Sequence, residues 1–208
     1  MPPFCLFISG AGGTGKTFLL KAIREKIERL TETSWSGRLS RVVVAASTGI
    51  AASHIPGAGT YHLKLAVRPG KPREGFVSTA RGTDLVLLKD RMRQLRAFFL
   101  DEVSMVGENS FDWLNARCCE LRGNNSVAFG GLDMIFFGDL YQLPPVRDAA
   151  VFRSFIWKSD MSFYELTENV RQGKDKVYQE ILNRVRVGDA QKGDVDRWRK
   201  SMPRRWGI

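Results

Sequence analysis

Short apolar runs alternate along the chain with segments of helical period, in the order that is typical of α/β proteins. The runs have strand length and cover residues 4–8, 41–46, 97–100, 133–137 and 163–166. Those at 41–46 and 97–100 are apolar without alternation, which indicates strands buried on both faces. Strands separated by helices predict a mostly parallel sheet with helices on both of its faces.

The longest helical pattern begins after residue 17. There Leu20, Ile23, Ile27 and Leu30 recur at spacings of three and four residues, so one face of the helix is apolar. The remaining helices are predicted at 47–52, 84–95, 108–121 and 176–187. Residues 31–40 are polar and predict a surface loop.

A glycine-rich segment joins the first strand to this helix. Its eight residues fit G-x-x-x-x-G-K-[ST], the phosphate-binding P-loop: Gly10, Ala11, Gly12, Gly13, Thr14, Gly15, Lys16 and Thr17. Backbone N–H groups of such a loop, with the following helix N-terminus, bind an anion. The lysine would contact the β- and γ-phosphates, and the threonine hydroxyl suits Mg²⁺. The alternative is a chance glycine-rich turn, but the motif and both flanks predict a site for ATP and Mg²⁺.

Two acids stand directly after the apolar run 97–100. Asp101 and Glu102 in this position form the Walker B pattern. Asp101 would hold Mg²⁺, and Glu102 would orient and deprotonate the attacking water. Gln142, after the run 133–137, is a candidate sensor of the γ-phosphate, with a solvent-facing loop glutamine as the alternative.

The chain of 208 residues has a net charge of +10 and a pI of about 9.9. This balance favours polyanions, although basicity can also serve solubility alone. Nine basic residues fall within residues 64–96, which form either a polyanion contact or a solvated face. They are Lys64, Arg68, Lys71, Arg73, Arg81, Lys89, Arg91, Arg93 and Arg96.

The three cysteines, Cys5, Cys118 and Cys119, do not form a disulfide framework. We therefore expect a reducing compartment and no zinc site. The apolar runs are too short for a membrane span, and the first residues lack the pattern of a secretory signal. An intracellular protein is expected, nuclear or mitochondrial if eukaryotic and cytoplasmic if bacterial or viral.

Six strings in this order and spacing resemble the PIF family of DNA helicases (named for petite integration frequency), in superfamily 1. RecD-like and Helitron-encoded helicases are near relatives. The strings are ASTGIAA at 46–52, GTYH at 59–62, LDEVSM at 100–105, FGGLDMIFFGDLYQLPPV at 129–146, ELTENVRQ at 165–172 and ILNRVRVG at 181–188. The resemblance covers about residues 5–188 and implies a RecA-like P-loop NTPase domain.

The resemblance also implies roles for single residues. Gln142 matches the motif that couples the γ-phosphate to DNA, and Arg171 matches an arginine that stabilises charge in the transition state. Thr48, Thr60 and His62 match positions that contact the DNA strand. The basic segment 64–96 falls where such helicases insert a small DNA-facing subdomain.

The family implies an ATP-driven motor that moves 5′ to 3′ on single-stranded DNA and unwinds duplexes and forks. We expect residues 1–188 to form the first motor lobe, and 189–208 a basic tail or the start of a next domain. A second motor lobe is expected in the full-length protein. The alternatives are a nucleotide-dependent DNA-binding module without helicase activity, or another P-loop enzyme such as a kinase.

Overall fold

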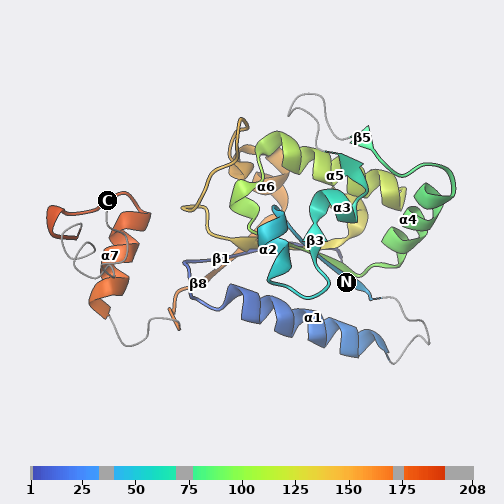
Figure 1. Cartoon of the computed structure of the whole chain (residues 1–208). Coiled ribbons are helices and arrows are strands. Elements are labelled where there is room, and N and C mark those ends of the chain that lie inside the picture. The colour runs from blue at the N-terminus through green and yellow to red at the C-terminus, as the bar shows by residue number, and fades with distance from the viewer. Residues whose placement is uncertain (1, 33–39, 69–76, 171–175, 195–208) are drawn as a thin grey trace.

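A six-stranded parallel sheet forms the centre of the computed structural model, which describes residues 2–32, 40–68, 77–170 and 176–194 (Figure 1). Its strand order is β3-β2-β6-β7-β1-β8, and every neighbouring pair is parallel. The strands are β1 (Cys5–Gly10), β2 (Val42–Ala46), β3 (Gly59–Thr60), β6 (Ala97–Asp101), β7 (Asp133–Gly138) and β8 (Met161–Leu166). The predicted parallel sheet is therefore confirmed.

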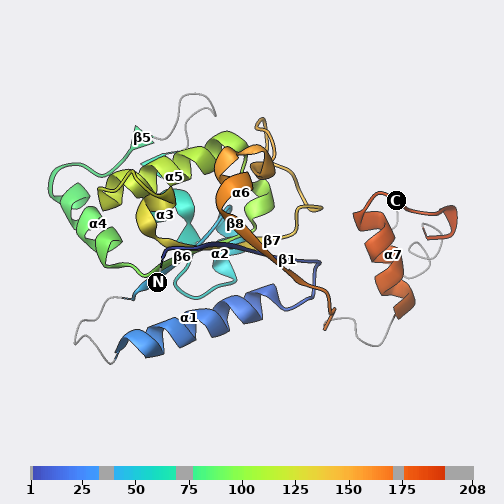
Figure 2. The ribbon, with the colours of Figure 1, turned by 180° about the vertical axis from the view of Figure 1, so that it is seen from behind.

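Helices cover both faces of this sheet (Figure 2). One face is covered by α1 (Lys16–Glu32), whose Leu20 packs in a cluster with Val44 and Phe99. The other face is covered by α4 (Gly82–Gln94), α5 (Glu108–Arg122) and α6 (Phe155–Asp160). Successive strand side chains point to opposite faces, so each buried strand supplies both clusters. This explains why the apolar runs show no polar alternation.

Aromatic rings fix α5 and α6 against the sheet. The Phe111 ring of α5 lies 5.2 Å from that of Phe136 in β7 and 5.6 Å from that of Trp157 in α6, between ring centroids. Tilted and edge-on ring pairs of this kind add to the free energy of burial. They hold the middle of the sheet in place, and with it the loops at the strand ends.

Several short elements were not predicted from the sequence. They are α3 (Tyr61–Lys64), the antiparallel hairpin of β4 (Val67–Arg68) and β5 (Val77–Ser78), and the 3₁₀ turns η1 (Val103–Met105), η2 (Ala128–Gly131) and η3 (Val151–Arg153), as well as β3 and α6. Elements of two to six residues contain too few positions to show a period.

Of the basic segment 64–96, the structure describes residues 64–68 and 77–96, and these pack on the domain; Lys71 and Arg73 lie outside the described residues. Met92 of α4 is buried, as the predicted helical period requires, and α2 (Gly49–Ser53) also forms where a helix was expected. The buried Arg117 of α5 donates from Nε and Nη2 to the carbonyl oxygen of Leu65, 3.2 Å away in both cases. The first half of this segment was predicted as loop, and there the structure instead pairs β4 with β5.

The last described helix is α7 (Lys176–Arg186), which in both ribbon views lies apart from the helices that cover the sheet. Ile181 on its apolar face is buried, whereas Val177 and Val185 are about half exposed. Arg171 and residues 195–208 lie outside the described residues. Within the described ranges, no helix combines the length and apolar character that crossing a bilayer requires.

Candidate nucleotide-binding site

The carboxyl ends of the parallel strands meet at one edge of the sheet, and the predicted site residues follow them there. The P-loop follows β1, Asp101 ends β6, and the segment with Gln142 follows β7. A cavity of about 450 Å³ opens at this edge. It is lined by Gly12, Gly13, Gly15, Lys16, Thr17, Phe18, Asp101, Glu102, Gln142 and Val170.

The P-loop has the backbone conformation that its glycines allow. Gly13 and Gly15 have φ values of 90° and 88°, a region that residues with a side chain rarely adopt. The Asn169 side chain donates to the carbonyl oxygen of Gly12 at 3.0 Å, and the Val170 N–H donates to that of Gly13 at 3.0 Å. Residues 169 and 170, which follow β8, therefore stabilise the P-loop through hydrogen bonds.

Lys16 lies folded against its own loop. Its Nζ donates to the carbonyl oxygens of Gly10 at 2.6 Å and Ala11 at 3.2 Å. An ammonium group has three donors, so one remains for a ligand in the cavity. Burial lowers the pKa of Lys16. The nearby carboxylates raise it, and that of Glu102 has the largest effect among them.

Two carboxyl groups face Lys16 from the end of β6. Asp101 is buried, and its Oδ1 accepts the N–H of Glu102 at 3.0 Å. Burial raises the pKa of Asp101, opposed by this hydrogen bond and by Lys16. Burial also raises the pKa of Glu102, and the neighbouring Asp101 charge adds to this effect. A raised pKa makes a carboxylate a better proton acceptor near neutral pH.

Glu102 also has a strained backbone. Its φ and ψ are 55° and 47°, in the left-handed region that costs energy for a residue with a Cβ. This conformation turns the chain sharply at the end of β6. Strain of this kind is concentrated at sites where a side chain must be aimed, which fits a carboxylate that lines the cavity.

The donor set in the cavity fits Mg²⁺. The Thr17 hydroxyl and the Asp101 carboxylate both line it, and oxygen donors of this kind are what the ion prefers. Across the described ranges, no three His, Cys, Asp or Glu side chains form a cluster that could hold a metal by themselves. Mg²⁺ in nucleotide sites uses one or two protein ligands and completes its shell with phosphate oxygens and water.

The structure adds two residues that the sequence did not single out. Asp139, just beyond β7, is fully buried, and Arg186 of α7 donates to both of its carboxylate oxygens at 2.8 Å. The same guanidinium lies 4.6 Å from the centroid of the Tyr141 ring. The charges of Asp139 and Arg186 both act on Lys16, so α7 is electrostatically part of this site.

Replacing Arg186 by Ala should lower the free energy of unfolding by about 3 kcal/mol, because the Asp139 carboxylate is then buried without its cation. Urea unfolding would measure this. The double variant D139N/R186M serves as the control and should recover more than half of the loss, since it removes both charges. Equal losses in the two variants would show that the ion pair is not what Arg186 contributes.

The three residues expected to contact DNA follow β2 and β3, which β6 and β7 separate from β1 and its P-loop. Ala46 of β2 pairs with Thr60 of β3, so Thr48 and Thr60 lie at the same edge of the sheet. Both hydroxyls cap helices: Thr48 accepts the N–H of Ala51, and Thr60 accepts that of Leu63. Their placement thus has a structural reason besides any DNA contact.

His62 of α3 is half-buried, and its ring lies 3.9 Å from the Tyr61 ring between centroids. Burial lowers the pKa of His62. At neutral pH the imidazole is therefore mostly uncharged, and it can offer a hydrogen bond rather than a positive charge to a phosphate.

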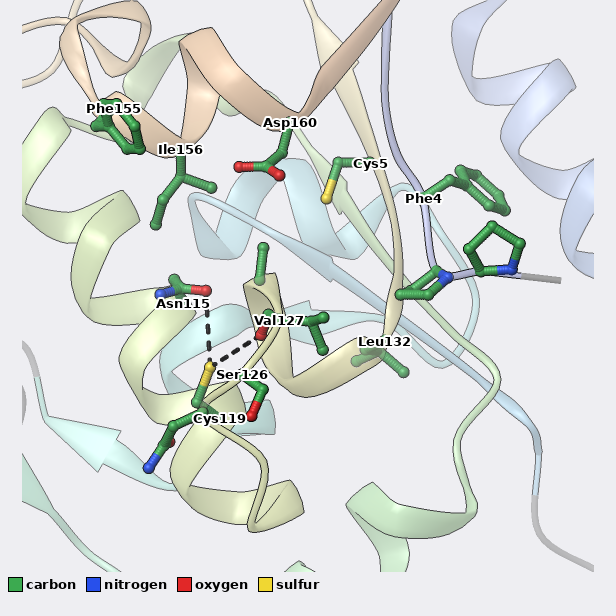
Figure 3. A pocket seen from close by; sticks show the side chains of 14 residues that line it. Phe4, Cys5, Asn115, Cys119, Ser126, Val127, Leu132, Phe155, Ile156 and Asp160 are labelled. Atoms are coloured by element: carbon green, nitrogen blue, oxygen red, sulfur yellow. Dashed lines mark hydrogen bonds between the residues drawn. The ribbon is translucent and has the colours of Figure 1, made fainter.

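A further cavity, of about 530 Å³, lies at the opposite edge of the sheet, where β1 begins (Figure 3). Phe4, Cys5, Asn115 and Cys119 are among its lining residues, and the Cys119 thiol interacts with the Asn115 side chain. Burial raises the pKa of Cys5 to about 12, so the thiol stays protonated and unreactive.

The fold and this site define a RecA-like P-loop nucleotide-binding domain. The sequence model of the family described as PIF1-like helicase matches residues 3–194. The chain therefore belongs to the PIF1-like helicase family.

Individual relatives agree with this assignment. The chain is 34% identical over 190 residues to the ATP-dependent DNA helicase PIF1 of Homo sapiens, a match that covers 88% of the chain and 27% of the human protein. The corresponding protein of Emericella nidulans is 31% identical over 190 residues, covering 88% and 24%. The chain thus spans about a quarter of the length of these relatives.

Solved structures show the same fold. The crystal structure of Pif1 helicase from Candida albicans matches with a TM-score of 0.77 and 31% identity, over 98% of this chain and 45% of that one. Pif1 helicase from Bacteroides, in complex with ADP-AlF3 and single-stranded DNA, matches with a TM-score of 0.77 at 24% identity, over 99% and 47%. The latter likeness concerns the fold alone.

Proposed function

We propose that this chain is the first motor lobe of an ATP-dependent DNA helicase. The whole protein would couple Mg-ATP hydrolysis to 5′-to-3′ movement along single-stranded DNA and to the unwinding of duplexes and forks. A second motor lobe would lie elsewhere in the full-length protein, which would act in whichever compartment holds its DNA.

One observation carries the proposal: a single cavity brings together the P-loop, the two acids of β6 and Gln142, in a chain of the PIF1-like helicase family. These groups come from residues 12–18, 101–102 and 142, far apart in sequence. Phosphate binding, metal binding and water activation each require one of them. Their convergence favours nucleotide hydrolysis over a simple anion site.

Each residue then has a role that its surroundings support. The free donor of Lys16 and the N–H groups of residues 12–17 bind the phosphates. Thr17 and Asp101 hold Mg²⁺, which supplies charge neutralisation at the phosphates. Glu102, with its raised pKa, accepts a proton from the attacking water.

Two further residues respond to the γ-phosphate in this proposal. Gln142 lines the cavity from the segment after β7, and its N–H donates to the Asp139 carbonyl oxygen at 2.9 Å. Arg171, directly after Val170 in sequence, would supply positive charge as the phosphate leaves. Thr48, Thr60 and His62, with the basic segment 64–96, would contact the DNA strand.

The test is ATP hydrolysis by this chain, with and without single-stranded DNA. Stimulation by DNA would show that one lobe senses both ligands, or that a second copy supplies a missing arginine. If Mg-ATP binds but is not hydrolysed, the chain acts alone as a nucleotide-dependent binding module. That second function is favoured by the fact that the chain spans only about a quarter of its helicase relatives. Absence of Mg-ATP binding would refute both.

A salt titration tests the DNA contacts. His62→Ala should weaken binding to single-stranded DNA about fivefold without changing the slope of log K against log salt, because the imidazole is uncharged at pH 7.5. Arg68→Ala, in the basic segment, should lower the magnitude of that slope by about 0.7.

The control is Lys21→Ala. Lys21 is exposed on α1, which covers the face of the sheet opposite to α4, and its replacement should change neither affinity nor slope. A fall in slope for His62→Ala would mean that the histidine binds DNA in its charged form. Unchanged binding in both variants would remove these residues from the interface.

A further inference from the structure

The mouth of the nucleotide cavity carries two apolar side chains that no step of hydrolysis uses. Phe18 of α1 and Val170, after β8, both line the cavity, and they are 80% and 71% exposed. A phenylalanine this exposed contributes little to folding. Its place beside the phosphate-binding loop therefore needs another explanation.

The backbone fixes where these two side chains lie. Phe18 directly follows Thr17 in the first turn of α1, where the Cα–Cβ bond tilts towards the helix N-terminus and hence towards the P-loop. Val170 is held at the loop by its N–H, which donates to the Gly13 carbonyl oxygen at 3.0 Å. The two side chains thus approach the same cavity from separate segments of the chain.

A nucleotide bound here has a defined direction. The carboxylates that serve hydrolysis, Asp101 and Glu102, lie at the sheet end of the cavity, so the terminal phosphate points inwards and the nucleoside points outwards. The two large apolar side chains that line the cavity, Phe18 and Val170, are both exposed. A flat ring with two faces is what an exposed phenylalanine and a valine can hold between them.

We infer that Phe18 stacks on the base of the bound nucleotide, with Val170 at the opposite side. The inference rests on the proposed nucleotide site and adds to it the contact with the base, so that the ring contributes to binding as well as the phosphates. Stacking uses the face of the base and requires no donor or acceptor on its edge.

The test compares two ligands, Mg-ATP and the Mg²⁺ complex of inorganic triphosphate, by calorimetric titration of this chain. Phe18→Ala should weaken Mg-ATP binding about tenfold, the size typical of one stacked ring, and leave triphosphate binding within about twofold. Phe18→Trp, which keeps an aromatic face, should retain Mg-ATP affinity. Phe155→Ala is the matched control, because Phe155 is 79% exposed and lines the cavity at the opposite edge of the sheet.

Three outcomes would overturn the inference while leaving the nucleotide site intact. They are unchanged Mg-ATP affinity in Phe18→Ala, an equal loss for both ligands, and wild-type binding of triphosphate as tight as that of Mg-ATP. If the wild-type chain binds neither ligand, the proposed nucleotide site itself fails, and the stacking role fails with it.

Discussion

Replacing Glu102 by Gln is expected to lower ATP turnover by about 10²- to 10⁴-fold, the usual contribution of a positioned general base. Mg-ATP affinity should stay within about twofold, because Glu102 is proposed to act on water rather than on the nucleotide. The amide is nearly isosteric and can keep the left-handed backbone at this position, but it cannot accept a proton. The measurement is a phosphate-release assay alongside a nucleotide titration.

The glutamine variant also separates this role from a structural one. Glu180→Gln, at an exposed position of α7, is the control for loss of one negative charge and should hydrolyse ATP like the wild type. A Glu102→Gln variant that turned over at the wild-type rate would show that another group serves as the base. If the wild-type chain hydrolyses ATP only when DNA is present, the comparison is made with DNA.

Replacing Lys16 by Ala should weaken Mg-ATP binding by about 10- to 100-fold, since hydrogen bonds to charged groups contribute about 1.5–3 kcal/mol. The lysine lines the proposed site, and the charges of Glu102, Asp139 and Asp101 act on it there. Without it, these carboxylates would repel an incoming triphosphate. A titration with Mg-ATP measures the loss.

Lys16 also binds two carbonyl oxygens of its own loop, so the fold of the variant must be checked by its unfolding transition. Lys21 lies further along α1 and is exposed, so the control variant Lys21→Ala should bind Mg-ATP with wild-type affinity. Unchanged Mg-ATP affinity in Lys16→Ala would refute the interpretation of residues 10–17 as a P-loop, independently of the results for the other variants.

The sequence predicted the parallel sheet and its main helices because each is long enough to show a period. From its motifs the sequence also assigned the P-loop and the two acids after residue 100 to one site for ATP and Mg²⁺; parallel strands bring these residues together because their carboxyl ends lie at one edge of the sheet. The structure places these residues, with Gln142, around one cavity. Their catalytic and binding roles remain predictions.

What the sequence could not predict depends on contacts between distant segments. The pairing of Asp139 with Arg186 arises only when α7 reaches the end of β7. Phe18 was unremarkable within an apolar helix pattern until the structure showed it exposed beside the P-loop. The sequence also gave no indication that β8 is the outermost strand, with Phe163 and Tyr164 more than half exposed.

The place of β1 in the sheet has a consequence for how the chain is made. β1 is synthesised before both of its neighbours in the sheet, so Cys5 can pair with Met134 of β7 and Met161 of β8 only after more than 120 further residues have been made. Contacts so distant in sequence are slow to form and expose apolar segments meanwhile. The phosphate-binding loop is therefore made well before the strands that flank β1 and before Asn169 and Val170, which hydrogen-bond to the loop.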